Sequence, residues 1–355
     1  MATSVSALTL PRLPVSPPMP ARASPAATMP RRRGTRPLRA ACAYALQEGQ
    51  SRRSHRLPCG LDLEVIAQQP PTPTPGRSDR PPLVFLHGSF HAAWCWAEYW
   101  LPFFSRAGFS CFALSLRAQG ESSIPSEAVA GTLETHSGDI ADFIRKEVPG
   151  PPILIGHSFG GLIVQQYISC LQGMKSSLRV TFSIINSEPL HPKLSGAVLV
   201  CSVPPSGNSG LVWRYLLTKP IAAVKVTLSL AAKAYANSLP LCKETFFSSE
   251  MDDELVLRYQ GLMKDSSKLP LFDLRKLNAS LPVPSVGNGT LEVLVMGASN
   301  DFIVDVEGLS ETARFYNVQP VCVEGVAHDM MLDCSWEKGA EIILSWLDKL
   351  VPRSV

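Results

Sequence analysis

The sequence predicts an α/β fold: a mostly parallel central sheet, helices on both of its faces, and a helical cap inserted before one of the last strands. Three observations support this. Nearly continuous apolar runs alternate with segments of helical periodicity, which is typical of buried parallel strands joined by helices. The chain has 355 residues, 45% of them hydrophobic, which is enough for one large core. Residues 204–290 lack a strand pattern and predict several short helices.

The first half of the sheet is predicted from apolar runs bounded by turn residues. An early strand or hairpin is expected within 57–69, and the proline-rich stretch that follows predicts a loop. The apolar runs at 82–88 and 109–117 predict strands that are buried on both faces. Between them, the aromatic-rich segment 91–108 predicts a helix. Apolar residues at helical spacing predict another helix over 135–148.

The second half continues the same alternation. Its strands are short apolar runs, and its last helix is an amphipathic segment, "SWEKGAEIILSWLDKL". Strands are expected at 151–156, 195–203, 291–299 and 320–325, and helices at 160–171 and 335–350.

A tight corner is predicted where one apolar strand meets the next helix. The sequence there is "ILIGHSFGGLIV" (154–165), in which a polar pair interrupts an apolar run. Ser158 would be pushed out of the sheet with its hydroxyl exposed, because a Cβ at Gly156 or Gly160 would collide with the neighbouring backbone. A serine in this position is a candidate nucleophile.

A serine nucleophile needs a histidine to take its proton and a carboxylate to orient that histidine. Of the seven histidines, His328 lies in "EGVAHDMMLD" just after the last predicted strand, where a parallel sheet exposes its site. The others are set aside by position: His55 precedes the domain, His87 begins a turn in which the backbone matters more than the ring, His91 and His136 fall at helix starts, His157 adjoins the serine, and His191 lies in an irregular stretch.

The expected acid is Asp301, which follows the strand at 291–299. Its position at a strand end favours it over Asp305 or Glu307, although Asp301 in a helix N-cap role is an alternative. Four other aspartates are not expected to serve: Asp329 and Asp333 are too close to His328 in sequence to reach its far nitrogen, and Asp139 and Asp142 are expected to be solvated helix residues.

Taken together, these segments resemble the α/β-hydrolase fold superfamily over about residues 80–350. "GHSFGG" resembles its nucleophile elbow, "HGSFHAAWCW" (87–96) its oxyanion loop, "NDFIV" and "AHDMMLD" its acid and base segments, and "LRAQGES" (116–122) a turn common in its esterases and lipases. The oxyanion segment is similar to that of plant methylesterases and hydroxynitrile lyases. The resemblance implies a Ser158–Asp301–His328 catalytic triad, with the backbone N–H groups of Ser89 and Phe159 as oxyanion-hole donors.

Residues 1–47 differ in composition from the remainder of the chain. They hold seven arginines, no lysine and no acid, so the formal net charge of +3 leaves 3 − 7 = −4 for the remainder, which argues against nucleic-acid binding. The arginine, serine and proline content and "LRAACA" (38–43) resemble a plastid transit peptide and its processing site. We therefore expect a chloroplast protein, stromal or membrane-peripheral. A merely disordered basic tail is the alternative.

The nine cysteines form no CxxC pair and several lie in apolar runs, so we expect small buried residues in a reducing compartment rather than a disulfide scaffold or a zinc site. No apolar run approaches the roughly 20 residues that a membrane span needs. The predicted organisation is a disordered tail over 1–47, a first part of the hydrolase core over 55–203, a helical cap or lid over 204–290, and a second part of the core over 291–355.

One connection is longer than the family's usual one. Between the helix after the elbow and the next strand lie residues 171–194, in which "RVTFSIIN" suggests an extra edge strand or a segment that an alternative gene product lacks. Its removal is expected to leave the triad intact.

The cap carries the prediction of substrate class. Residues 210–239 are strongly apolar, and their only charges are Arg214, Lys219, Lys225 and Lys233. This pattern suits a lipophilic acyl or prenyl chain, or contact with an anionic membrane surface, and a core-facing helix with solvated lysines fits as well. We expect a lipase-like serine hydrolase that cleaves a lipophilic carboxylic ester through an acyl-enzyme, without metal or organic cofactor. An acyltransferase, a hydroxynitrile-lyase-like enzyme and a triad-retaining ligand receptor are the alternatives.

Overall fold

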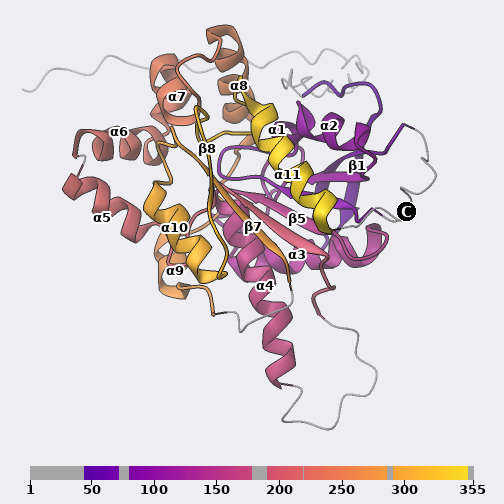
Figure 1. Cartoon of the computed structure of the whole chain (residues 1–355). Helices are drawn as coiled ribbons and strands as arrows, with labels where there is room; N and C mark the ends of the chain where they lie inside the picture. Colours follow the sequence, from indigo (N-terminus) through magenta and orange to yellow (C-terminus); the bar gives the residue numbers. More distant parts are fainter. Residues whose placement is uncertain (1–43, 72–79, 178–189, 219, 286–290, 351–355) are drawn as a thin grey trace, which may run out of the picture. The chain divides into compact units, whose positions relative to one another are not determined.

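The computed structural model describes residues 44–71, 80–177, 190–218, 220–285 and 291–350. Within them the strands form one sheet in the order β1-β2-β4-β3-β5-β6-β7-β8 (Figure 1). The strands are β1 (Gln50–Arg56), β2 (Asp62–Gln68), β3 (Leu83–Leu86), β4 (Cys111–Leu114), β5 (Ile153–His157), β6 (Gly196–Val200), β7 (Val293–Ala298) and β8 (Val321–Val323).

The helices follow the strands in the predicted alternation. They are α1 (Trp94–Ala97), α2 (Trp100–Arg106), α3 (Leu133–Glu147), α4 (Phe159–Ser177), α5 (Ser209–Thr218), α6 (Pro220–Ala231), the short 3₁₀ helix η1 (Ala234–Asn237), α7 (Leu239–Phe246), α8 (Asp253–Ser266), α9 (Leu274–Ser280), α10 (Val306–Phe315) and α11 (Trp336–Leu350).

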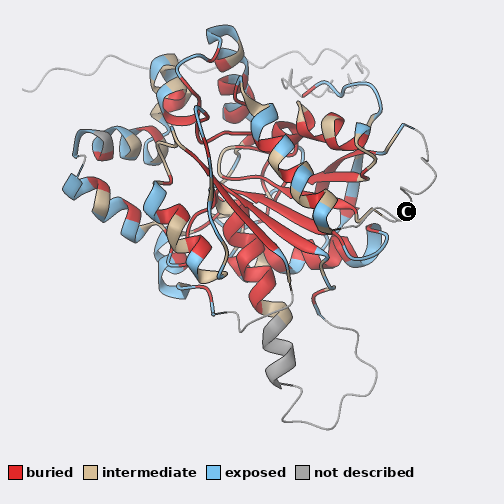
Figure 2. Cartoon of the chain, in the orientation of Figure 1, coloured by how far each residue is buried: buried red, intermediate tan, exposed pale blue. Residues whose placement is uncertain are grey.

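The prediction of a mostly parallel sheet with helices on both faces is confirmed. All neighbouring strands from β4 through β3 to β8 run parallel, and only β1 with β2 and β2 with β4 are antiparallel. The central strands are buried along their whole length (Figure 2). Their side chains alternate between two core clusters: Leu83 and Phe85 pack with α1, α2 and α11, whereas Val84 and Leu86 pack with α3 and α4.

Two local expectations differ from the structure. The segment 91–108 contains two helices, because Tyr99 leaves the helical region at φ −130° and ends the first helix. Helix α10 was not predicted. Its start is marked by Asp305, whose side chain accepts a hydrogen bond from the backbone N–H of Gly308 at 2.9 Å, a common helix N-cap arrangement.

The expectation that Asp139 and Asp142 are solvated is wrong. Both lie in α3 and are only 7% exposed. Asp139 forms a bidentate pair with Arg117, with both contacts at 2.6 Å, and the carboxylate of Asp142 lies 3.1 Å from the ring of His55 and 2.9 Å from Lys146. Asp139 can be buried because Arg117 reaches it from another segment, and the ring of His55 reaches Asp142 from β1; helical spacing alone does not indicate either contact.

The ordered fold begins before the predicted start of the domain. His55, expected to precede the domain, is a buried residue of β1. Tyr44 also packs into the core, and Gln47 donates to the carbonyl of Glu98 at 2.8 Å, although both were assigned to the tail. Residues 1–43 and 178–189, where most of the predicted tail and the extra strand fall, lie outside the described residues.

The segment 204–290 contains α5 to α9, and its parts differ in how deeply they pack. Side chains of α7 and α8, including Phe246, Tyr259 and Met263, belong to the core cluster around α1 and α2. Trp94 of α1 donates to Ser266 at the end of α8 at 2.8 Å. By contrast, α5 and α6 expose most of their large apolar side chains (Figure 2).

The described cysteines are all free. Four of them, Cys95, Cys111, Cys201 and Cys242, are buried, whereas Cys59, Cys322 and Cys334 are exposed. None of the helices in the described ranges has the length and apolar character that crossing a bilayer requires.

Candidate active site

The predicted elbow is present at the end of β5. Ser158 has φ +54°, a left-handed backbone conformation that is strained for a residue with a side chain, and α4 begins at the next residue. A Cβ at Gly156 would lie 2.5 Å from the carbonyl oxygen of Gly160, and a Cβ at Gly160 would lie 2.6 Å from that of His87. Both positions therefore require glycine for the predicted steric reason.

Hydrogen bonds from the neighbouring strand hold the strained serine. The N–H of Ser158 donates to the carbonyl of Val200 at 3.1 Å, and its carbonyl accepts from Gly161 and Val203 at 3.1 and 3.2 Å. These bonds hold Ser158 at the carboxyl end of β5, but the residue is only 7% exposed, so the expectation of an exposed hydroxyl is wrong.

His328 and Asp301 meet at the same edge, on the loops that follow β8 and β7. His328 Nδ1 lies 2.9 Å from each carboxylate oxygen of Asp301, so Nδ1 carries the hydrogen and Nε2 is left as an acceptor. Asp301 Oδ1 also accepts from the backbone N–H groups of Ile303 and Val304, both at 2.8 Å. Burial acts to lower the pKa of His328, but the Asp301 carboxylate outweighs it and raises that pKa above its usual value.

The residue that precedes Ser158 in the chain, His157, contacts His328. His157 Nε2 donates to the backbone carbonyl of His328 at 2.9 Å, and the two rings lie 4.7 Å apart. The Ser158 hydroxyl itself makes no hydrogen bond with any described residue, so Asp301 and His328 are the two members of the predicted triad that a hydrogen bond joins. Asp305 and Glu307 do not contact His328: Asp305 caps α10 and pairs with Arg214 at 2.6 Å.

The loop after β3 lies directly against the elbow. A Cβ at Gly88 would be 2.7 Å from the Cβ of Ser158, so only glycine allows the two segments to approach this closely. His87 Nδ1 donates to the carbonyl of Gly88 at 2.7 Å. In a trans peptide the C=O and N–H point in opposite directions, so this bond also orients the N–H of Ser89.

The N–H groups of Ser89 and Phe159 have no acceptor among the described residues, as expected for donors reserved for a ligand. The ring of His87 matters here, contrary to the expectation from sequence. Its Nε2 accepts from the N–H of Leu116 at 3.0 Å, which fixes the neutral form, and burial lowers its pKa to about 3.

Sequence reasoning missed a second buried histidine–aspartate pair beside the site. His91 Nε2 lies 2.8 Å from Asp329 Oδ2, and both side chains are buried. Asp329 was considered only as a partner of His328, its neighbour in sequence. The single hint in the sequence was an unexplained acid inside the apolar stretch "VAHDMML".

Two groups bring potential metal ligands within 4.8 Å of one another among the described residues: His157, His328 and Asp329, and Cys201, Asp301 and His328. His328 Nδ1 is engaged by Asp301 in both groups, and His157 Nε2 is engaged by a carbonyl in the first. The other nitrogen of each ring, His328 Nε2 and His157 Nδ1, is not engaged by these bonds.

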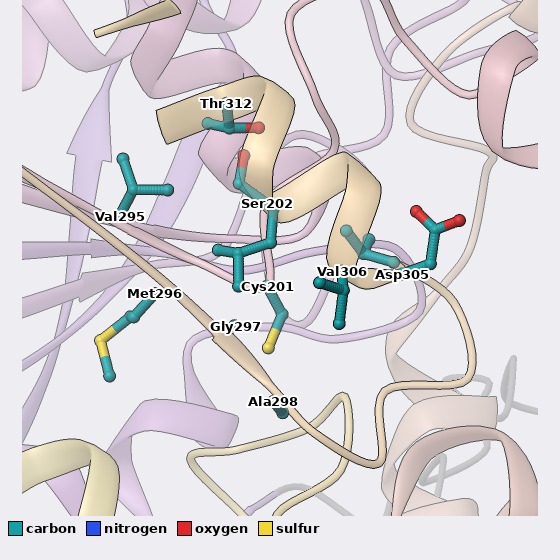
Figure 3. Close-up of a pocket in the computed structure, with 11 residues that line it drawn as sticks. Cys201, Ser202, Val295, Met296, Gly297, Ala298, Asp305, Val306 and Thr312 are labelled. Carbon is teal, nitrogen blue, oxygen red and sulfur yellow. The ribbon is translucent and has the colours of Figure 1, made fainter. Parts of the chain in front are cut away.

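A small pocket lies next to this edge, between the ends of β6 and β7 and the start of α10 (Figure 3). It is lined by Cys201, Ser202, Asp305 and apolar residues, and by none of Ser158, Asp301 and His328. We therefore assign it no role in the candidate chemistry.

Comparison with known proteins concerns the family and the fold. The model of a family described as "Alpha/beta hydrolase family" matches residues 83–341. Protein phosphatase methylesterase 1 of Homo sapiens is 36% identical over 88 residues, which cover 24% of this chain and 23% of that protein. The probable esterase PIR7A of Oryza sativa subsp. japonica is 38% identical over 80 residues, 22% of this chain and 30% of the relative. The matches thus span less than a third of either relative.

Solved structures share the fold over most of the chain. A putative lipase (lip1) from Acinetobacter baumannii AYE has a TM-score of 0.61 at 19% identity and covers 85% of this chain and 92% of its own. The esterase EaEST from Exiguobacterium antarcticum has a TM-score of 0.59 at 19% identity, with coverage of 83% and 98%. At these identities the likeness concerns the fold.

Proposed function

Because the chain belongs to the alpha/beta hydrolase family, we propose that it is a serine hydrolase that cleaves a lipophilic carboxylic ester with Ser158, His328 and Asp301. The observation that carries the proposal is the buried Asp301–His328 hydrogen bond, which leaves Nε2 as an acceptor, beside a strained serine on an elbow. Esterase-named relatives support the carboxylic-ester class. No cofactor enters the proposed chemistry.

In the first half-reaction, Ser158 Oγ attacks the ester carbonyl carbon while His328 Nε2 takes the hydroxyl proton. The carbonyl π electrons move to oxygen, and the resulting oxyanion accepts hydrogen bonds from the N–H groups of Ser89 and Phe159. Each such donor contributes about a hundredfold or more in rate. Collapse of this intermediate expels the alcohol, which takes the proton from His328, and leaves an acyl-Ser158.

In the second half-reaction, water replaces the alcohol. His328 removes a proton from water as it attacks the acyl carbonyl, and returns that proton to Ser158 Oγ when the acid leaves. Throughout both steps Asp301 keeps the hydrogen on Nδ1 and stabilises the imidazolium. An added alcohol that intercepts the acyl-enzyme would give a new ester, so product analysis separates hydrolysis from acyl transfer.

The lipophilic substrate is suggested by the exposed apolar face of α5 and α6. Seven large apolar side chains stand exposed there: Val212, Trp213, Leu216, Leu217, Ile221, Val224 and Leu228. Residues 209–243 contain no aspartate or glutamate. In this proposal the face rests on an anionic lipid surface from which the ester enters. Arg214 and Lys225 are paired with Asp305 and Glu244, so apolar contact contributes more than charge.

Vesicle sedimentation tests the lipid contact. Leu217→Glu and Ile221→Glu alter the two most exposed positions of this face, 80% and 76% exposed. Each should weaken binding to phosphatidylglycerol vesicles by roughly tenfold or more, since burying one such side chain contributes about 1.5–3 kcal/mol. Ile124→Glu, at an exposed position outside the cap, is the matched control. Equal binding by all variants would remove the lipid surface from the proposal.

Labelling by a fluorophosphonate tests the catalytic assignment. Ser158→Ala should abolish both covalent labelling and turnover of a p-nitrophenyl acyl ester. Ser209→Ala, an exposed serine within the elbow-like "SGNSG" at 206–210, should leave both intact. Activity retained in the Ser158 variant would refute the assignment.

The chloroplast location belongs to the same proposal and rests on the composition of residues 1–47. Those residues fused to a fluorescent protein should direct it into isolated plastids and be removed there. A fusion protein that stays outside the plastids at full length would contradict it.

A further inference from the structure

The buried pair formed by His91 and Asp329 has no part in the proposed reaction. Both side chains are almost completely inaccessible, at 1% and 0% exposed, and their atoms Nε2 and Oδ2 lie 2.8 Å apart. A buried carboxylate is costly unless it is paired, so the arrangement calls for a physical explanation.

The hydrogen-bond partners of His91 define its protonation state. Its Nδ1 lies 2.8 Å from the carbonyl oxygen of Ser89, an acceptor only, while its Nε2 faces the carboxylate of Asp329. Both contacts are hydrogen bonds donated by the ring when each of its nitrogens carries hydrogen, and we infer this doubly protonated ring from the geometry of the two acceptors. Burial acts to raise the pKa of Asp329, but the nearby histidines, His91 first, lower it below its usual value, so the carboxylate is ionised.

Two other histidines at this edge, His157 and His87, are neutral for the same kind of reason. His157 donates from Nε2 to a carbonyl and leaves Nδ1 without a partner in the described structure, and burial lowers its pKa well below the usual value. His87 donates from one nitrogen and accepts at the other. Neither of these two rings therefore supplies a positive charge to Asp329.

The pair connects the two loops whose relative positions the proposed reaction depends on. His91 bonds the carbonyl of Ser89, whose N–H is the proposed oxyanion donor. Asp329 directly follows the proposed base, and its own N–H donates to the carbonyl of Phe246 in α7 at 2.9 Å. The ion pair therefore ties the oxyanion loop to the loop that carries His328 and to the cap.

We propose that the His91–Asp329 ion pair is a positioning device that holds the oxyanion loop against the base-bearing loop, and that its negative end tunes the base. This inference rests on the proposed function for its kinetic consequences, whereas the protonation state of His91 is independent of it. The strained φ of +69° at Phe90, between Ser89 and His91, is consistent with a loop that the pair holds in place.

The negative charge of Asp329 should affect the pH dependence of the activity. The ionisable groups that face His328 are Asp301 after β7, His157 at the end of β5, Cys201 at the end of β6, and Asp329 itself. The negative charge of Asp329 adds to that of Asp301 in raising the pKa of His328. Removing it lowers that pKa, and since the base acts in its neutral form, the acid limb of the activity profile moves to lower pH.

Three single variants test the proposal. His91→Leu frees the Ser89 carbonyl and leaves Asp329 unpaired. Asp329→Asn removes the charge but retains both hydrogen bonds, because its amide donates to Nε2 of a neutral His91 whose Nδ1–H still reaches Ser89. Asp333→Asn is the matched control: Asp333 is also 0% exposed in the same loop, but it bonds Ser248 of the cap, at 2.9 Å, rather than His91.

The kinetic readout is hydrolysis of a p-nitrophenyl ester. We expect His91→Leu to lower kcat by about ten- to a hundredfold with KM changed less than about threefold. We expect Asp329→Asn to move the acid limb of kcat/KM down by roughly half a pH unit or more, and Asp333→Asn to leave it in place. An unchanged kcat in His91→Leu would overturn the positioning role, and an unmoved limb in Asp329→Asn, or the same shift in Asp333→Asn, would overturn the effect of Asp329 on the base.

A second readout needs no activity. In the full chain labelled with ¹⁵N-histidine, NMR should show hydrogen on both ring nitrogens of His91 at about pH 7.5, where an unpaired histidine is mostly neutral. In Asp329→Asn one of those hydrogens should be lost. A neutral His91 in the wild-type chain would refute the ion pair, whether or not Ser158 reacts with a fluorophosphonate. A doubly protonated His91 in a chain whose Ser158 does not react would overturn only the proposed function.

Discussion

Replacing Asp301 by asparagine should inactivate the enzyme by reversing the tautomer of its base. Oδ1 of Asp301 accepts from the N–H groups of Ile303 and Val304, both at 2.8 Å. In the variant only the amide oxygen can occupy that place, so the NH₂ group is left facing His328 Nδ1. With the NH₂ group 2.9 Å from Nδ1, an imidazole that accepts at Nδ1 and carries its hydrogen on Nε2 is favoured, and that tautomer cannot take the proton of Ser158, although the amide oxygen also lies 2.9 Å from Nδ1.

The magnitude follows from that geometry. The same tautomer reversal in a Ser-His-Asp hydrolase lowers kcat about 10⁴-fold, equivalent to about 5.5 kcal/mol of activation free energy. The assay is kcat for a p-nitrophenyl acyl ester above the acid limb, together with the rate of fluorophosphonate labelling, and circular dichroism confirms that the variant folds.

Asp305→Asn provides the matched control. Asp305 lies on the same loop, caps α10 and pairs with Arg214, but it does not contact His328. This variant should keep kcat within about threefold while losing about 1 kcal/mol of stability from the weakened cap and surface pair. If Asp301→Asn retained more than about a tenth of wild-type kcat, the role of Asp301 in fixing the tautomer would be refuted.

Three further predictions concern stability, measured by urea unfolding. Gly160→Ala should lower the free energy of unfolding by about 3 kcal/mol or more, because the new Cβ would meet rigid backbone. Gly261→Ala in α8, which has open space around it, should raise the free energy of unfolding by up to about 1 kcal/mol. Equal effects of the two variants would show that the elbow relaxes. Arg117→Met should cost about 3 kcal/mol by leaving Asp139 buried without its partner, and adding Asp139→Asn should recover part of the loss; no recovery would contradict the ion-pair explanation. Burial lowers the pKa of His136 to about 4, whereas a histidine in the unfolded chain has a pKa near 6.5, so between these values the unfolded chain binds more protons and the protein loses stability as the pH falls. His136→Asn should reduce the slope of unfolding free energy against pH by up to about 1.4 kcal/mol per pH unit. An unchanged slope would refute the assignment.

The local features of the fold were predictable from sequence. Apolar strands of the central sheet are buried on both faces, so their composition alone identifies them. The elbow at Ser158 was predictable because its glycines, its serine and the flanking apolar residues are contiguous. The parallel sheet then implies that loops after its strands share one edge, and that is why the pairing of Asp301 with His328 could be anticipated from chain order alone.

Features that depend on distant segments were not predictable. The burial of Asp139 and Asp142 required Arg117 and His55 to arrive from other elements. The break in the aromatic helix at Tyr99 reflects packing on the core, as does the role of the His87 ring.

The sequence by itself determined the strands, the elbow and the order of the candidate catalytic segments, since these depend on patterns within a few residues. The tertiary structure alone decided which buried acids have partners, which histidine lies beside Asp329, and which part of the cap stays exposed. These properties depend on what lies across a packed interface, and a buried group is stable there only when its partner, however far along the chain, is within hydrogen-bonding distance.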